Sequence, residues 1–162
     1  MTGRDRRKRT ASVVPALVAM IFGMGGPLPA HACKVTGLSV VRLTDDTVLA
    51  RAQAQEFTLI WRHSVTLTPV YAAYAIDADG TLRQTEERFA AHGPGMAFGG
   101  EGWQIRGDQM VLTLNRPIPQ LILRSDIPHQ NRLIAGDTEI DLTRWPGVPL
   151  EIRATPCKDP VR

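Results

Sequence analysis

The chain has little of what metal centres and disulfide frameworks are built from, with only two cysteines and four histidines in 162 residues. After residue 33 the histidines are His63, His92 and His129, and none stands two or four residues from another. Such short spacings make a metal site recognisable in a sequence. A metal site would have to be assembled from distant residues such as His63, His92 and Glu86, so we expect no metal and no cofactor.

Long amphipathic helical periods, internal repeats and low-complexity linkers are also missing. The chain is instead divided into short segments rich in β-branched and aromatic residues, which favours strands. Tight turns are predicted where a glycine adjoins an aspartate, at Asp79-Gly80, Gly107-Asp108 and Gly136-Asp137, because such pairs adopt the positive φ angles of β-hairpins. We therefore predict one all-β domain, an antiparallel sandwich or a partly closed barrel of short strands.

Eleven strands are predicted, over residues 34–43, 48–54, 57–65, 70–77, 82–89, 103–106, 110–115, 120–124, 131–135, 139–142 and 150–155. The least distinct part is residues 44–56, whose alanines and glutamines also tolerate a helical turn. Ile60 interrupts the alternation of the third segment, in which Phe57, Leu59 and Trp61 form the apolar face.

The first 32 residues have the organisation of a secretory signal peptide. Residues 4–9 are mostly basic, residues 11–24 are largely apolar, and Ala30-His31-Ala32 has the small-x-small form of a signal-peptidase site. Pro15 and several glycines interrupt the apolar run, whereas a membrane-spanning helix needs roughly 20 apolar residues. We predict cleavage after residue 32, a periplasmic domain of residues 33–162 and no stable membrane span after cleavage, with a retained anchor as the alternative.

Removal of this segment changes the charge of the chain. Five of the 19 Lys and Arg residues and one of the 16 Asp and Glu residues precede residue 33, which leaves 14 basic and 15 acidic side chains and a net charge of −1. No basic patch of the density that nucleic acids require remains. We expect no nucleic-acid partner.

The two cysteines, Cys33 and Cys157, stand at the two ends of the predicted domain. In an oxidising compartment such a pair favours a disulfide, which would join the first strand to the last. The alternatives are acylation of Cys33 as a lipoprotein, which the preceding residues disfavour because they lack the usual leucine, and two unpaired thiols.

Several ordered motifs resemble the domain-of-unknown-function family 1850. They are His63-Ser64-Val65, Thr68-Pro69-Val70, Tyr74, Glu86 with Arg88-Phe89, and the Gly93-x-Gly95-Met96 loop. The resemblance extends more faintly to Leu121, Leu123-Arg124, Leu133, Gly136 and Leu142. It implies a small exported or membrane-tethered β protein associated with tripartite ATP-independent periplasmic (TRAP) transporters of the TAXI type. The chain departs from the family pattern at Ala72, where an acidic residue is usual, and at His92, Pro94 and Ala97.

A binding site is hypothesised around the glycine loop, at one end of the sheet. Its candidate residues are Arg62, His63, Ser64, Glu86, Arg88, Gly93, Gly95 and Met96. Glycines let backbone amides approach a partner closely, and guanidinium groups suit carboxylates. The competing interpretation is structural: the apolar residues form the core, and His63 and Ser64 satisfy buried backbone groups.

The function expected from the resemblance is a non-catalytic periplasmic accessory protein of a TAXI-type TRAP transporter of organic anions. Its partners would be the TAXI solute-binding protein or the TRAP membrane subunits. The alternative is a free-standing binding module for a small carboxylate, held by Arg62 and Arg88. A serine hydrolase built on Ser64 is less favoured, because neighbouring residues in a strand point to opposite faces and His63 cannot easily serve as its base. We therefore expect no enzymatic activity.

Overall fold

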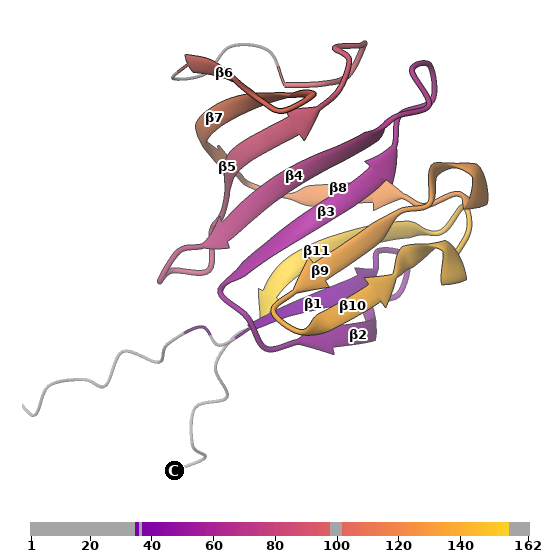
Figure 1. The fold of residues 1–162 in the computed structure, drawn as a ribbon. Coiled ribbons are helices and arrows are strands. Elements are labelled where there is room, and N and C mark those ends of the chain that lie inside the picture. The colour runs from indigo at the N-terminus through magenta and orange to yellow at the C-terminus, as the bar shows by residue number, and fades with distance from the viewer. Residues whose placement is uncertain (1–34, 36, 98–101, 156–162) are drawn as a thin grey trace, which may run out of the picture. The chain divides into compact units, whose positions relative to one another are not determined.

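Eleven strands and two short 3-10 helices make up the computed structural model over the residues it describes, which are 35, 37–97 and 102–155 (Figure 1). These residues belong to one unit, Ala32–Arg162. The predicted signal peptide and both cysteines lie outside the described residues. In the described part of the chain, no helix has the length and apolar character needed to cross a membrane.

The strands form two antiparallel sheets, as the sequence predicts for a sandwich, and neither sheet closes on itself over the described residues. Sheet A has the order β2-β1-β11-β8, with β1 Gly37–Arg42, β2 Thr47–Ala52, β8 Leu121–Arg124 and β11 Pro149–Thr155. Sheet B has the order β10-β9-β3-β4-β5-β7-β6, with β3 Glu56–Arg62, β4 Pro69–Ile76, β5 Leu82–Phe89, β6 Gly102–Arg106, β7 Gln109–Ile118, β9 Arg132–Ala135 and β10 Thr138–Asp141. The 3-10 helices are η1 Ile127–His129 and η2 Leu142–Arg144.

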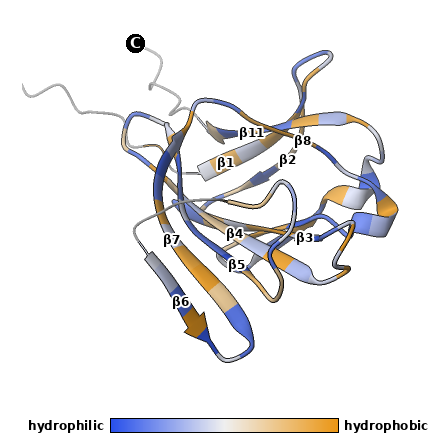
Figure 2. Ribbon diagram, turned by 90° about the horizontal axis from the view of Figure 1, so that it is seen from above, coloured by the Kyte–Doolittle hydropathy of each residue, from blue (hydrophilic) through white to orange (hydrophobic). Residues whose placement is uncertain are grey.

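Three hairpins of sheet B turn at the predicted glycines. Gly80, Gly107 and Gly136 have φ angles of 89°, 64° and 56°, which residues with a side chain rarely adopt. Figure 2 shows the β6–β7 hairpin with its hydrophobic residues in orange. Among the described strands, β6 is the last of sheet B and pairs with β7 alone.

Residues 44–56, which the sequence leaves open between strand and helix, contribute β2. Pairing with β1 decides this, since residues Thr47–Ala52 hydrogen-bond along β1 as an antiparallel strand. The register shifts opposite Val40 and Val41, whose partners are Ala50 and Val48, so Leu49 is an extra residue in β2. Tertiary pairing here overrides the helix tolerance of alanine and glutamine.

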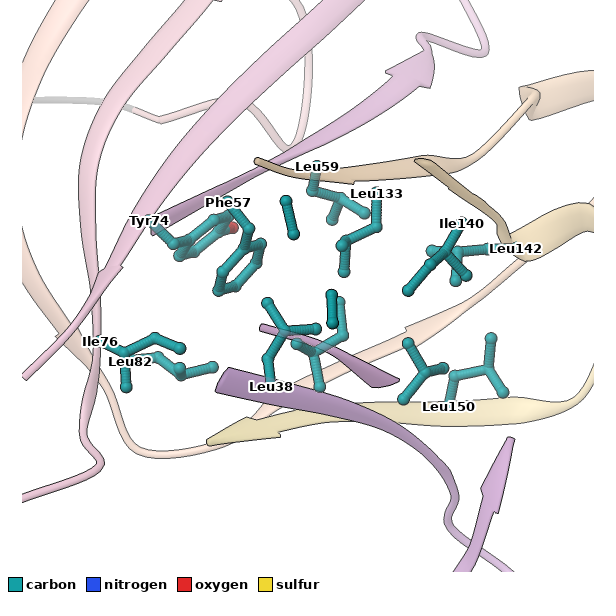
Figure 3. Packing of buried hydrophobic residues seen from close by; sticks show 14 of the residues in the cluster. Leu38, Phe57, Leu59, Tyr74, Ile76, Leu82, Leu133, Ile140, Leu142 and Leu150 are labelled. Carbon is teal, nitrogen blue, oxygen red and sulfur yellow. The ribbon is translucent and has the colours of Figure 1, made fainter. Parts of the chain in front are cut away.

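The main core lies between the sheets. In Figure 3, Leu38 and Leu150 of sheet A face Phe57, Leu59 and Leu133 of sheet B. Each fully buried side chain of this size stabilises the fold by roughly 1.5–3 kcal/mol relative to exposure.

At β5 and β7, sheet B is covered by the loop that follows β5. Val70, Phe89 and Met96 form a second apolar cluster, and Ala97, Leu112 and Leu114 form a third. Met96 and Ala97 belong to the loop that follows β5, so the inner face of β5 and β7 packs against this loop. The loop is therefore part of the core structure and also borders the candidate site.

Candidate functional site

The structure brings part of the predicted site together at one end of the sandwich. His63 and Ser64, which follow β3, lie beside Pro94, Gly95 and Met96 and line one cavity with them. Gly93 packs directly on the His63 ring, since a Cβ atom on Gly93 would lie only 2.7 Å from Cε1 of His63. The structure therefore places the His63 segment beside the glycine loop, which is the first half of the hypothesis.

His63 holds the two segments together through all the hydrogen-bonding capacity of its ring. Nδ1 accepts hydrogen bonds from the backbone N–H groups of Val65 and Thr66, both at 3.2 Å. Nε2 therefore carries the proton and donates it to the carbonyl oxygen of Pro94 at 3.1 Å. Because the side chain is also buried, with 5% exposed, His63 acts as a structural clamp and offers no nitrogen to a metal or a nucleophile.

Ser64 lies in a tight turn that His63 organises. The N–H of His63 donates to the Thr68 carbonyl oxygen at 2.9 Å, and the Leu67 N–H donates back to the His63 carbonyl oxygen at 3.0 Å. Leu67 has a φ of 56°, a left-handed conformation that is costly for such a side chain. Ser64 is exposed in this turn, next to a histidine whose nitrogens are both engaged.

The glycine loop is fixed from within by Met96. The Gly93 N–H donates to the Met96 sulfur at 2.9 Å, and the Met96 N–H donates to the Gly93 carbonyl oxygen at 3.3 Å. The Met96 side chain is buried against Val70 and Phe89. Pro94 and Gly95 remain exposed at the tip of the loop, so an ordered tip projects from a buried anchor.

Glu87 fixes the far end of the loop, a role that the sequence interpretation missed. Its Oε1 accepts from the Ala97 N–H at 2.7 Å, and its Oε2 accepts from Nε2 of Gln84 at 2.8 Å. Gln84 in turn accepts from the Arg116 guanidinium through its Oε1. Glu87 and Gln84 are both almost fully buried, and a buried carboxylate is tolerated because its oxygens are hydrogen-bonded.

A bulge in β5 explains why Glu87, and not Glu86, faces inward. Ala73 and Tyr74 of β4 pair with Glu86 and Gln84, so Thr85 is an extra residue in β5, and the register with β7 also shifts here. The extra residue shifts the alternation of the residues that follow it. The sequence carries a signal of this shift, because Leu82 and Phe89 are both apolar but seven positions apart. Residues at an odd separation in a regular strand face opposite sides, so burying both requires a bulge.

Glu86 and Arg88 do not join the His63 end of the site, which corrects the second half of the hypothesis. They lie on the other face of sheet B, where Arg88 Nε pairs with Glu86 Oε1 at 3.0 Å and Arg106 Nη1 approaches Glu86 Oε2 at 3.3 Å. The Arg88 guanidinium also lies over the Tyr71 ring, 4.9 Å from its centroid. Its charge is thus already engaged by an acid and an aromatic ring.

Arg62 borders two hollows. Its Nε donates to the Leu67 carbonyl oxygen at 3.2 Å. One hollow lies over Tyr71 and Arg132, and the other is the cavity at the His63 end. Arg88 lines neither of them, so the structure does not join Arg62 and Arg88 in one carboxylate site.

Ala72, where the family pattern has an acidic residue, is fully buried and pairs across the strands with Glu87. A carboxylate therefore lies beside this position on the neighbouring strand. Tyr74, on the same strand as Ala72, is buried, and burial together with the negative charge of Glu87 raises its pKa to about 12.

Of the three histidines in the described residues, His63 and His129 line the same cavity and His92 lies outside it. His92 packs edge-on against Phe89 and Trp103, and Nδ1 of His129 lies 3.2 Å from the Arg62 carbonyl oxygen. Over residues 35, 37–97 and 102–155, no group of three or more His, Cys, Asp or Glu side chains is placed to hold a metal ion.

Comparison with known proteins identifies a family but no characterised relative. No curated protein matches the chain, and no solved structure does. The family model for a domain of unknown function, DUF1850, matches residues 57–142. The matched segment runs from β3 into η2 and contains the His63 clamp, the glycine loop and Glu87. This chain belongs to the DUF1850 family.

Proposed function

We propose that this protein is a non-catalytic periplasmic accessory protein of a TAXI-type TRAP transporter of organic anions. The resemblance described above supports the choice of partner, namely the TAXI solute-binding protein or the TRAP membrane subunits. The observation that carries a protein-binding role is the apolar edge strand β6 beside the glycine loop.

Strand β6 exposes large apolar side chains at the margin of sheet B. Trp103 is 48% exposed and Ile105 is 81% exposed. They lie on the same side of the strand, two residues apart, and Trp103 packs edge-on against Phe89 and His92 at the start of the loop. An apolar edge strand invites pairing with another chain unless a partner covers it.

The loop beside this strand is suited to recognition because it is already ordered. Three anchors hold it: the His63 ring on Pro94, the Met96 side chain in its apolar cluster, and Glu87 on Ala97. A partner that binds the exposed tip therefore has little loop entropy to overcome. We define the docking surface as Pro94, Gly95, Trp103 and Ile105.

Site-directed cross-linking in the native cells tests this role. A photoreactive amino acid replaces Ile105 in the docking surface or, as the control, Val48 of β2, which is exposed on sheet A. We expect the Ile105 position to capture the solute-binding protein or a TRAP membrane subunit, identified by mass spectrometry, and the Val48 position not to. Capture of neither transporter component from Ile105, or equal capture from both positions, contradicts the proposal.

A charge substitution adds a second measurement. Ile105→Asp places a carboxylate on the apolar surface and should prevent recovery of the transporter components with a C-terminally tagged protein. Val48→Asp should leave recovery unchanged. Both positions are exposed, so neither substitution is expected to change stability by more than about 0.5 kcal/mol.

A further inference from the structure

The cavity at the His63 end has the properties of a ligand site. Its volume is about 280 Å³, just below the roughly 300–1,000 Å³ of pockets for drug-sized ligands. It lies between the turn after β3, the glycine loop and the segment around η1, and its lining contains no Asp or Glu. The size and the missing acids favour a small, negatively charged molecule.

Arg124, the last residue of β8, supplies a cation to this cavity. Its Nη1 donates to the Gly147 carbonyl oxygen at 3.3 Å, which uses one of the five N–H donors of a guanidinium. Arg124 forms no ion pair with the described part of the chain, in contrast to Arg88 and Arg132, which pair with Glu86 and Glu139. The remaining donors of Arg124 suit a carboxylate.

Asn131 lines the same cavity and has an unsatisfied acceptor. The residue is 8% exposed and lines the cavity, and its buried Oδ1 has no hydrogen-bond partner among the described residues. A buried amide oxygen without a donor is uncommon in folded proteins. Asn131 therefore favours a ligand that brings a hydrogen-bond donor.

His129 provides a second acceptor. Its Nδ1 lies 3.2 Å from the carbonyl oxygen of Arg62, and a carbonyl oxygen only accepts, so Nδ1 carries the proton. Nε2 of the neutral ring is then an acceptor as well. Trp61 and Met96 complete the lining with apolar surface, which suits the carbon skeleton of an organic ligand better than a strongly hydrated inorganic anion.

We propose that this cavity binds a small 2-hydroxycarboxylate. The carboxylate binds the Arg124 guanidinium, the hydroxyl group donates to Asn131 Oδ1, and the carbon chain packs against Trp61 and Met96. His63 forms the wall of the cavity and keeps its ring nitrogens on the backbone. Pro94 and Gly95 belong both to the docking surface and to the lining of this cavity, whereas Trp103 and Ile105 lie outside the lining. The ligand site does not depend on the accessory role, because its binding is measured on the purified protein without any transporter component.

Calorimetric titration of the purified protein with matched acids tests the proposal. Malate and lactate carry the 2-hydroxyl group, and succinate and propionate are their counterparts without it. We expect at least one hydroxy acid to bind about tenfold more tightly than its counterpart, because a site built around a hydroxyl group rejects the analogue that lacks it. Equal affinities in both pairs, no binding of any acid at about 20 mM, or tighter binding of inorganic phosphate overturn the proposal.

Substitutions of Arg124 and Asn131 test the role of each residue in binding the acid. Arg124→Gln should weaken binding of the preferred hydroxy acid by about tenfold or more, while Arg51→Gln, an exposed arginine on β2 outside the cavity, should leave it unchanged. Asn131→Leu, which has the same number and branching of side-chain heavy atoms but no polar group, should remove the preference for the hydroxy acid over its counterpart. Unchanged binding in Arg124→Gln, or an equal loss in Arg51→Gln, contradicts the site. The preference measured in the unmodified protein decides the proposal even if a variant does not fold.

Discussion

His63 and Pro94 stand 31 residues apart in the sequence and are joined by a hydrogen bond of 3.1 Å from Nε2 to the Pro94 carbonyl oxygen. The same ring accepts from the Val65 and Thr66 N–H groups. His63→Phe keeps an aromatic ring, which is larger than imidazole and packs against Gly93, but leaves these backbone groups without partners. We expect it to lower the free energy of unfolding by about 2–4 kcal/mol, measured by urea denaturation. His92→Gln, at an exposed histidine, should lose no more than about 0.5 kcal/mol, and equal losses would show that His63 is no clamp.

Glu86 and Glu87 are neighbours in the chain that should respond differently to the same substitution. Glu87→Gln replaces an oxygen that accepts from Ala97 or Gln84 with an NH2 group, which places two donors against each other. We expect a loss of about 1–3 kcal/mol in the free energy of unfolding and faster hydrogen exchange at the Ala97 amide.

Glu86→Gln is the matched control for this prediction. The Glu86 carboxylate makes only partly exposed ion pairs with Arg88 and Arg106, and such pairs contribute about 0–1 kcal/mol. If Glu86→Gln proves as costly as Glu87→Gln, the inward orientation of Glu87 is wrong.

The glycines of the loop are required for different reasons. A Cβ atom at Gly93 would lie 2.7 Å from Cε1 and 2.9 Å from Nε2 of His63, a ring that three hydrogen bonds hold in place. Gly95 has open space around it but a φ of 84°. We expect Gly93→Ala to cost about 1–3 kcal/mol through overpacking. Gly95→Ala should cost about 1 kcal/mol through backbone strain, and Gly95→Asn should recover part of that loss because asparagine tolerates this φ, whereas Gly93→Asn should recover nothing. Thermal unfolding of the four variants compares these losses.

The raised pKa of Tyr74 predicts that the folded protein loses stability at alkaline pH. Burial and the Glu87 charge raise the pKa of Tyr74 to about 12, above the unfolded value of 10.0. The folded state therefore holds this proton more tightly, and the resulting stability is fully present below pH 10 and is lost as the pH rises toward 12. The loss should be on the order of 2–3 kcal/mol. Tyr74→Phe keeps a ring that can stack on Phe57 but cannot ionise, so its stability should fall less over the same range. The free energy of unfolding of both proteins is measured by urea denaturation between about pH 9 and pH 12. An equal decrease in the two proteins would contradict the prediction.

The predicted disulfide between Cys33 and Cys157 is testable by thiol titration. The pairing of Gly37 with Thr155 brings the chain ends that lead to both cysteines to the same end of sheet A. We expect no free thiol in the unfolded, unreduced protein and two after reduction. Cys157→Ser should cost about 4–5 kcal/mol in the chain-entropy account. Two free thiols before reduction contradict the bridge, and a lipid-modified Cys33 in the mass spectrum identifies the lipoprotein instead.

The strands of this fold could be predicted because their ends are marked locally. All eleven predicted segments overlap a strand of the structure, since turn pairs such as Asp79-Gly80 and Gly136-Asp137 depend only on neighbouring residues. One of the largest differences at a boundary is in β7, which continues to Ile118, three residues beyond the predicted segment. The order of the strands in the two sheets could not be predicted, because it depends on contacts between distant segments. The pairing of β1 with β11 is the clearest example.

The candidate site could be predicted only in part for the same reason. The His63 and Gly93–Met96 motifs meet, but the β5 bulge turns Glu87 inward and leaves Glu86 and Arg88 on the other face. Arg124, His129 and Asn131 come to the cavity from segments that follow the glycine loop by more than twenty residues. No local pattern distinguishes them from ordinary surface residues.

The pairing of β1 with β11 also determines when sheet A can form. The first strand lies between β2 and β11, and β11 lies between β1 and β8. While the ribosome is still making the C-terminal third of the chain, β1 has only the β2 hairpin as a partner, and an isolated hairpin is marginally stable at best. Sheet A, and the core that it closes over sheet B, can therefore be completed only after synthesis has reached β11.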